Sequence, residues 1–507
     1  MPVFAAVDIG ANSVRLKIAE LTRRKLKVIH EDREVTRLGE SVFRNNTLAP
    51  NAMEHTVKVL TRFYRATQKF RVEQVRVVST SPLRDSKNAR AFLEWVKSAV
   101  GWNVEIISGL EEGRLIHLGI LSNVRIENKD VLLFDLGGGS CEITISEHGH
   151  IREMFSLPLG AVRLTQEFLL HDPPKSKEVE RMREYITEQV NRIAPAIKRY
   201  RVNLAIATSG TAAALAGASR AIQGRSKYAH KVSRAMTVEL ARKLAVRARS
   251  ARAEYPGIGP KRAEIIVAGA FVFSELMIHY GLSSFQYSPL GLRDGLLAQM
   301  AADADVGTRA HRQLEAEQED ALVSLGRHYN ADARHASQVR DLALQLFRSL
   351  QRIHGLPPDY TQWIGAAAML HEIGSYVNRN GRHRHTYYLI ANSELFGFSP
   401  EQRHLIAAIA RYMGKSRPSE RDREVRGLRP SVRQLLDRAV VLLRIARALN
   451  QGRRGIVQKV RALEQGATVV LELRGKSGMD LEVWAADKER NYFRDVFGRD
   501  LVVRAAL

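Results

Sequence analysis

Two copies of one short motif bring together residues that could do phosphate chemistry. Residues 8–13 (DIGANS) and 135–140 (DLGGGS) both read Asp-x-Gly-x-x-Ser, and each follows an apolar run. Glycine lets backbone N–H groups approach an anion closely, and serine adds a hydroxyl donor. An ordinary turn is the alternative for one copy alone, whereas two matched copies favour phosphate binding. The predicted phosphate-binding residues in these loops are Asp8, Gly10, Asn12, Ser13, Gly137, Gly138, Gly139 and Ser140.

Acidic side chains near these motifs could complete a hydrolytic site. Asp135 stands where a carboxylate could hold Mg²⁺ directly or through water. Glu111 and Glu112 follow a strand-like run and a glycine, and we expect only one of them to face a cleft. A glutamate there could take the proton from an attacking water. An acid that interacts with a helix dipole is the alternative.

Three further segments carry candidate anion-binding positions. ATSGTAAALAGA joins a strand-like run to an Ala-rich helix, which leaves N-terminal amides near Gly210 and Thr211 for an anion. Arg84 in STSPLRDSKN and Arg293 in SPLGLRDG stand next to turn residues, and arginine suits bidentate phosphate contact. A helix cap and surface ion pairs are the alternatives.

The segments that must position these residues alternate in type. PVFAAVDIG, VRLKIAEL, VRVVSTS and VEIISG are strand-like, and residues 51–69 have helical spacing. VLLFDLGGGS, CEITISEHG and LAIATSG form a second strand cluster. Because Asp8 and Asp135 lie 127 positions apart, the sequence predicts a duplicated α/β unit. We expect domains at residues 1–125 and 126–303, facing each other across a ligand cleft.

The remaining residues predict two further domains. From about residue 304 the sequence has helical spacing. Apolar residues recur with a 3.6-residue period at Val339, Leu342, Ala343, Leu346, Leu350 and Ile353. This predicts a helical domain over residues 304–455. ATVVLELRG and MDLEVWAAD are strand-like, which predicts a small α/β module over residues 456–507.

Composition limits the classes of function. The 507 residues include 78 basic and 54 acidic ones, for a net charge of +24. This charge attracts nucleic acid, anionic lipid or a polyphosphate-like substrate, with a solvated basic surface as the alternative. A single cysteine and the lack of a long apolar run favour a cytoplasmic protein that does not span a membrane. GxxxxGK[ST], GxSxG, HExxH, zinc-finger and RNP patterns are absent, so we expect no Walker-type site and no specific nucleic-acid binding.

The ordered motifs resemble those of the exopolyphosphatase and guanosine pentaphosphate phosphohydrolase (Ppx/GppA) family. They are DIGANSVRL, STSPLRDSKNA, IISGLEEGRL, FDLGGGSCE, ATSGTAAAL and SPLGLRDGLL. The resemblance implies a duplicated actin-like (ribonuclease-H-like, ASKHA) α/β fold for residues 1 to about 300. LHEIG and HRHTYYLIANSELFGFS look like the HD-like third domain of the family's long form. The resemblance further implies Glu112 as catalytic base, Asp135 and Glu142 at the Mg²⁺ site, and a homodimer.

The sequence departs from the family pattern in two places. Asp294 stands where the family usually has Glu, which we expect to have little effect. In the HD-like region His335 and His371 are kept, but Glu372 replaces a metal-binding Asp and Arg447 stands where a final Asp is expected. A cation at a ligand position repels a divalent ion, so we expect no active HD metal centre.

A basic stretch in the helical region suits a long anion. Residues 376–454 contain 16 Arg and one Lys against six acidic residues. In the family's longer members a chain of phosphates is thought to follow basic residues, so the resemblance implies a polyphosphate track here. A solvated, arginine-rich surface is the alternative. The candidate track residues are Arg382, His383, Arg384, Arg411, Lys415 and Arg417.

These inferences predict a Mg²⁺-dependent phosphoanhydride hydrolase that acts through a Glu112-activated water. Its expected substrate is inorganic polyphosphate, and conversion of pppGpp to ppGpp is an additional or main activity. A kinase of the same fold superfamily is one alternative, and it would need an adenosine pocket. A non-catalytic protein that binds polyphosphate or an alarmone is the other, although a pure binder would not need Glu112.

Overall fold

The computed structural model describes residues 1–124, 126, 129–223 and 231–506. The chain divides into two compact units, Met1–Leu314 and Glu315–Leu507. The bounds of the four domains expected from the sequence remain a prediction, because the two units divide the chain once, inside the domain expected over residues 304–455.

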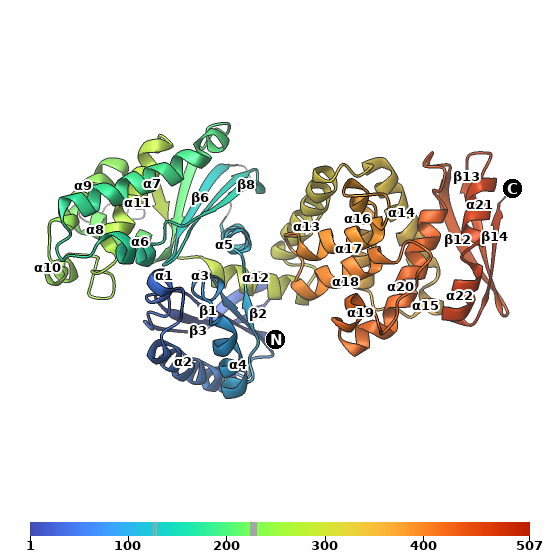
Figure 1. Ribbon diagram of the computed structural model, residues 1–507, viewed down its shortest axis with the longest axis horizontal. Coiled ribbons are helices and arrows are strands. Elements are labelled where there is room, and N and C mark those ends of the chain that lie inside the picture. The colour runs from blue at the N-terminus through green and yellow to red at the C-terminus, as the bar shows by residue number, and fades with distance from the viewer. Residues whose placement is uncertain (125, 127–128, 224–230, 507) are drawn as a thin grey trace. The chain divides into compact units, whose positions relative to one another are not determined.

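The first unit contains two sheets built on the same plan (Figure 1). In each, three consecutive strands form an antiparallel meander, and a later strand pairs in parallel with the first strand of that meander. The repeat agrees with the duplication expected from the two loops. One sheet has the order β3 (Lys25–Glu34), β2 (Val14–Thr22), β1 (Val3–Ile9), β4 (Gln74–Ser79), β5 (Val104–Ile106). The other has the order β10 (Lys231–Ser233), β11 (Ser284–Tyr287), β9 (Leu204–Thr208), β6 (Asp130–Leu136), β7 (Cys141–Glu147), β8 (His150–Leu157).

Helices cover both sheets. The long helices of this unit are α2 (Pro50–Lys69), α4 (Ala89–Val100), α5 (Gly109–Asn123), α7 (Ser176–Ile197), α8 (Ser209–Gln223), α9 (Arg234–Ala245), α11 (Ile266–His279) and α12 (Leu292–Ala304). Helix α2 forms where the sequence predicts one, because Val57, Leu60 and Phe63 fall on one apolar stripe. Nearly every residue of α11 is buried, so this helix lies inside the second half.

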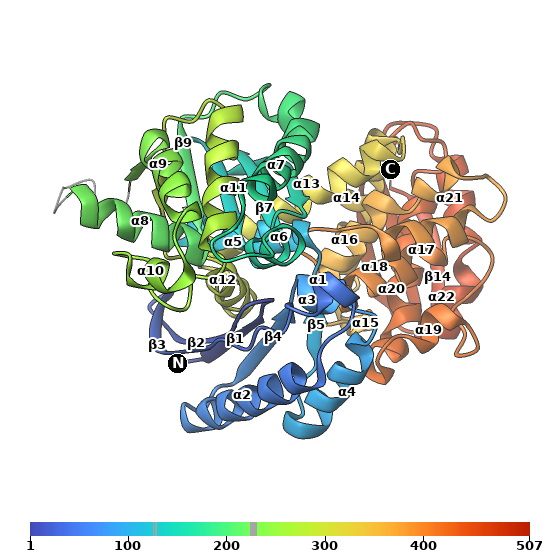
Figure 2. The ribbon, with the colours of Figure 1, turned by 60° about the vertical axis from the view of Figure 1, so that its left-hand side comes forward.

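One apolar layer joins the two halves. Phe4 and Ala6 of β1 and Val131 and Leu133 of β6 belong to the same cluster as apolar residues of α5 and α12. In two views, α5 and α12 lie between the sheets (Figures 1 and 2). Gly109 at the start of α5 packs against Ser156 of the second sheet, and Asp294 in the first turn of α12 accepts a hydrogen bond from Lys17 of the first sheet.

The second unit is mainly helical and has one three-stranded sheet. Its longer helices are α14 (Ala333–Ser349), α16 (Tyr360–Leu370), α17 (Arg382–Asn392), α18 (Pro400–Arg411) and α20 (Pro430–Ala448), and the unit boundary falls inside α13 (Arg309–His328). The sheet has the order β12 (Val457–Gln465), β13 (Thr468–Gly475), β14 (Asp500–Ala505). Side chains of the helices and the sheet share one hydrophobic core.

The strand predicted from MDLEVWAAD is wrong. Residues Asp480–Asp487 form helix α21, and the sheet takes its third strand from β14 instead. The buried side chains in this segment are Met479, Glu482, Ala485 and Ala486, which are spaced as on one face of a helix. Leu481 and Trp484, on the other side of this helix, are exposed.

Among the described helices, none has both the length and the apolar character that crossing a membrane requires.

Candidate active site

The two Asp-x-Gly-x-x-Ser loops are closed in the same way. The N–H of Gly10 donates to the carbonyl of Ser13 at 3.2 Å, and the N–H of Gly137 donates to the carbonyl of Ser140 at 2.9 Å. The loops also touch each other. A Cβ on Gly138 would lie only 2.8 Å from the Cβ of Ala11, so the loops can approach this closely only because the residue is glycine.

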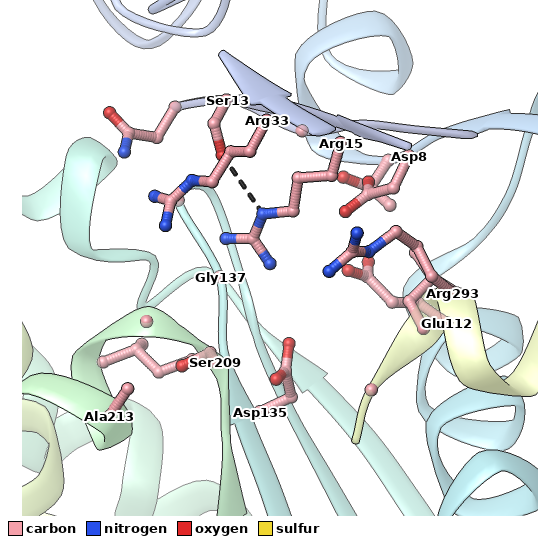
Figure 3. A pocket seen from close by; sticks show the side chains of 18 of the residues that line it. Asp8, Ser13, Arg15, Arg33, Glu112, Asp135, Gly137, Ser209, Ala213 and Arg293 are labelled. Atoms are coloured by element: carbon pink, nitrogen blue, oxygen red, sulfur yellow. Dashed lines mark hydrogen bonds between the residues drawn. The ribbon is translucent and has the colours of Figure 1, made fainter. Parts of the chain in front are cut away.

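A cavity of ≈ 240 Å³ lies at these loops, and side chains from both halves point into it (Figure 3). Arg15 and Arg33 enter from the first sheet, while Asp135 and Ser209 lie opposite them. The sequence-predicted residues that line the cavity are Asp8, Gly10, Asn12, Ser13, Glu112, Asp135, Gly137, Gly138, Gly210 and Arg293.

Three buried carboxylates meet beside this cavity. Glu112 lies in the first turn of α5, whose N-terminus is capped by the Ser108 hydroxyl. Asp135 of β6 and Glu142 of β7 are direct cross-strand partners, so their side chains share one face of the sheet. One carboxylate oxygen from each of the three lies within 4.8 Å of the other two.

The neighbouring Glu111 is engaged elsewhere. Its two carboxylate oxygens accept hydrogen bonds from Arg114 at 2.8 and 2.7 Å. Of the two adjacent glutamates, Glu112 alone lines the cavity.

Crowding of like charges changes the protonation of this cluster. Burial raises the pKa of Glu112 well above its usual range, and the Glu142, Asp135 and Asp8 carboxylates raise it further. The pKa of Glu142 rises to about 7, chiefly because of burial. Burial also raises the pKa of Asp135, although the Thr208 hydroxyl donates to this carboxylate. The site therefore favours a cation that compensates these charges.

The donor set fits Mg²⁺. The Oε2 atoms of Glu112 and Glu142 are buried and have no hydrogen-bond partner among the described residues. Carboxylate oxygens are the protein ligands that Mg²⁺ prefers, and a divalent cation would lower the raised pKa values by its charge.

Four arginines supply the opposite charge. Arg15 of β2 and Arg33 of β3 are direct cross-strand partners, and two like charges at this position destabilise a sheet. Burial, Arg15 and Arg293 lower the pKa of Arg33 to about 10. Burial, Arg15 and Arg33 lower the pKa of Arg262 to about 9. Within the described part of the chain, no carboxylate forms an ion pair with Arg15, Arg33 or Arg262, so these groups can bind an anionic ligand.

Sequence reasoning missed Arg15, Arg33 and Arg262. Arg15 could have been found, because it stands two positions after Ser13 on the same face of a strand. Arg33 reaches the cavity because β3 pairs with β2, and no motif in the sequence around Arg33 indicates this pairing. Arg262 lies against Gly210, where a Cβ would be 1.7 Å from the guanidinium, so this glycine makes room for an arginine.

Two predicted residues act on the carboxylates from outside the cavity lining. The Ser140 hydroxyl donates a hydrogen bond to Glu142. Arg84 donates to the carbonyl of Ile107 at 3.0 Å, and its charge lowers the pKa values of Glu112 and Glu142.

Two other predicted residues fill packing positions. A Cβ on Gly139 would lie 2.2 Å from the Ser81 hydroxyl oxygen, so the glycine allows close packing rather than lining the cavity. Thr211 is 1% exposed, and its side chain lies against Gly269.

Asp294 is well accommodated despite its shorter side chain. Its Oδ2 accepts a hydrogen bond from the N–H of Gly291 at 3.0 Å, and its Oδ1 accepts one from Lys17 at 2.8 Å. The aspartate thus anchors the N-terminus of α12 to the first sheet, next to Arg293.

In the second unit, a basic cavity of ≈ 370 Å³ contains three of the six candidate track residues. Its cationic or imidazole side chains are Arg382, His383, Lys415, Arg444, Arg447 and Lys488. Arg384, Arg411 and Arg417 do not line it. Arg417 pairs with Asp495 at 2.7 Å, and Arg411 lies 3.8 Å from Glu424. Of the six candidate track residues, three therefore share this cavity and three lie outside it.

Known proteins share both parts of this chain. Residues 17–304 match the Ppx/GppA phosphatase family, and residues 318–482 match domain III of Ppx/GppA phosphatases. A Ppx/GppA family member from Aquifex aeolicus is 29% identical, with a TM-score of 0.52 over 60% of this chain and 99% of that one. An exopolyphosphatase from Cytophaga hutchinsonii shares the fold at 24% identity, with a TM-score of 0.56 over 60% of this chain and 100% of that one. Because the first family match alone spans more than half of the sequence, the chain belongs to the Ppx/GppA phosphatase family.

Proposed function

We propose that this protein removes terminal phosphate from inorganic polyphosphate by Mg²⁺-dependent hydrolysis. The observation that supports this most directly is one cavity that borders a carboxylate cluster and is also lined by Arg15, Arg33 and Arg262, which have no carboxylate partner in the described part of the chain. Carboxylates can bind a cation and accept a proton, whereas arginines bind phosphoryl oxygens. Membership of a phosphatase family agrees with hydrolysis as the reaction.

Each residue type has a part in the proposed reaction. Glu112 takes the proton of the attacking water through its unpartnered Oε2 atom, and it needs the ionised form for this, which a cation held by Asp135 and Glu142 would favour. Asp135 and Glu142 would hold Mg²⁺, which when bound supplies positive charge to the transferring phosphoryl group. The N–H groups of the two loops and the Ser13 hydroxyl orient the terminal phosphoryl group. The cavity arginines neutralise charge on the leaving phosphate chain.

The lining of the cavity favours a chain of phosphoryl groups as substrate. Arg15, Arg33, Arg262 and Arg293 all line it, so more than one phosphoryl group can be neutralised. Tyr287 is the one aromatic side chain among the described lining residues. A guanine base would need stacking and amide partners, and the lining offers few of these.

Phosphate release from long-chain polyphosphate and from pppGpp, with Mg²⁺ and with EDTA, tests the proposal. We expect Mg²⁺-dependent release by the wild-type protein, with polyphosphate as the better substrate. Glu112→Gln should abolish release and keep polyphosphate binding, because it removes a base but preserves shape. Glu111→Gln is the matched control and should keep turnover, since Glu111 contacts Arg114.

Three results would contradict parts of the proposal. Unchanged turnover in Glu112→Gln would remove Glu112 from its assigned role. Faster release from pppGpp would make the alarmone the principal substrate. Tight binding of both ligands without release by the wild-type protein would identify a binding protein.

A further inference from the structure

A second cluster of ligand-type side chains lies in the helical unit, independent of the proposed active site. His335 lies in the first turn of α14, and His371 and Glu372 follow the end of α16. One nitrogen or oxygen atom from each lies within 4.8 Å of the other two. The two imidazole rings are tilted toward each other, with centroids 5.4 Å apart. Two imidazoles and a carboxylate form the donor set that Zn²⁺ and Co²⁺ bind well.

Both imidazoles are buried, and one nitrogen of each ring has no hydrogen-bond partner among the described residues. His335 is 4% exposed and His371 2% exposed. Neither Nε2 atom has a hydrogen-bond partner in the described part of the chain, and His335 Nε2 lies 4.0 Å from Glu372. The Nδ1 atom of His371 lies 2.7 Å from the Ala368 carbonyl, which orients the ring and leaves Nε2 as the lone-pair atom.

The segment that follows α20 closes this cluster. The Arg453 Nη2 atom lies 2.7 and 2.6 Å from the two Glu372 carboxylate oxygens, and its Nη1 atom lies 3.4 Å from Asp332. The Asn450 side-chain amide lies 3.0 Å from His335 Nδ1, while its carbonyl oxygen accepts from the N–H of Gly455. The amide NH₂ therefore faces the ring, so Nδ1 accepts and the neutral His335 carries its proton on Nε2; the ring must change tautomer before Nε2 can bind an ion.

The cation that blocks the cluster is not the one expected from the sequence. Arg447 donates to the Met413 carbonyl and lines the basic cavity of this unit. Helix α20 ends at Ala448, and the turn after it brings Arg453 to Glu372 instead. One guanidinium thus neutralises the carboxylate that a metal would use.

We propose that His335, His371 and Glu372 form a latent transition-metal site that Arg453 keeps closed in the native protein. Arg453 holds both oxygens of the carboxylate, so an ion must displace it to gain its third ligand. The closure can be removed by mutation, because the Arg453 side chain is 46% exposed and does not fill the core. The donor set suits borderline ions such as Zn²⁺ and Co²⁺ better than Mg²⁺.

Titration of the full-length protein with Co²⁺ tests this proposal through the visible absorption of imidazole-bound cobalt. We expect Arg453→Ala to bind one Co²⁺ at least about tenfold more tightly than the wild-type protein, because the carboxylate is released. Arg454→Ala is the matched control, as this neighbouring arginine makes no contact with the cluster. The all-oxygen carboxylate set at the first unit gives only weak absorption, so the signal reports the histidines.

A second variant separates misfolding from a wrong assignment. Arg453→Met keeps the aliphatic stem and should bind Co²⁺ like Arg453→Ala, while Arg453→Met combined with His371→Ala should lose the signal. Equal Co²⁺ affinity in the wild-type protein and Arg453→Met would overturn the closing role. Absence of the signal in folded Arg453→Met, or its survival without His371, would overturn the site itself.

Discussion

Gly119 of α5 and Gly295 of α12 are in direct backbone contact. A Cβ on Gly119 would lie 2.6 Å from the backbone nitrogen of Gly295, and a Cβ on Gly295 would lie 1.8 Å from the Leu115 carbonyl oxygen. Helix α5 carries Glu112 in its first turn, and α12 begins next to Arg293. The crossing of these two helices therefore fixes the distance between the proposed base and a cavity arginine.

Gly295→Ala should reduce turnover by roughly tenfold or more, because the added methyl group forces the helices apart and shifts Glu112 relative to Arg293. The overpacking should also lower the free energy of unfolding by about 1–3 kcal/mol. Steady-state phosphate release and thermal unfolding measure the two effects. Gly326→Ala in α13 is the control. A Cβ there would lie 3.8 Å from the Cβ of Ala331, so this variant should keep turnover and stabilise the helix by about 1 kcal/mol. Wild-type turnover in Gly295→Ala would show that the contact does not position the site.

Arg33→Gln should raise the stability of the ligand-free protein and reduce the additional stability that a phosphate ligand confers. Removing one charge of the Arg15–Arg33 cross-strand pair relieves repulsion worth about 0.5–1 kcal/mol. The same change removes a cation from the cavity, so added tripolyphosphate should raise the unfolding temperature less than in the wild-type protein. Thermal unfolding with and without tripolyphosphate gives both numbers.

Arg76→Gln provides the matched control for that experiment. Arg76 lies on the same sheet and pairs with Glu105 at 2.8 Å, outside the cavity. This variant should lose a little stability and keep the full response to tripolyphosphate. An equal response in Arg33→Gln and wild-type protein would exclude Arg33 from ligand binding.

Local sequence patterns predicted the parts of the site that depend on local structure. The loops at Ser13 and Gly137 were found because one turn supplies their geometry within six residues. Arg33 and Arg262 were not found, because a strand pairing and a loop packed on Gly210 bring them in from elsewhere in the chain. Arg453 was missed for the same reason, since its partner Glu372 lies 81 positions earlier. The short apolar segment MDLEVWAAD is compatible with a strand or a helix, and its packing against neighbouring elements favours the helix.

Glu142 should make the stability of the metal-free protein depend on pH. Folding raises the pKa of Glu142 from 4.5 to about 7, so the folded state binds this proton more tightly than the unfolded state. The stabilisation is complete below pH 4.5 and is lost as the pH rises to about 7. In EDTA, the free energy of unfolding of the wild-type protein should therefore fall relative to Glu142→Gln by up to about 3 kcal/mol across this range.

Chemical denaturation at several pH values measures this difference. Glu73→Gln changes an exposed side chain and should follow the wild-type curve. Mg²⁺ should restore stability near pH 7, because it favours the ionised carboxylates. Parallel curves for wild-type protein and Glu142→Gln would mean that Glu142 does not hold the extra proton.

Arg382→Glu should weaken binding of long-chain polyphosphate far more than hydrolysis of a short phosphoanhydride. Arg382 lines the basic cavity of the helical unit with Lys415 and Arg447. Arg382→Glu removes a positive charge and adds a negative one there, so the cavity attracts a polyanion less strongly. Arg384→Glu makes the same change of charge two residues away, on an exposed side chain outside that cavity. Chain-length-resolved binding and turnover should therefore distinguish these variants, with Arg384→Glu close to the wild-type protein. Equal losses in both variants would indicate general attraction by a basic surface, and equal losses on long and short substrates would exclude a track.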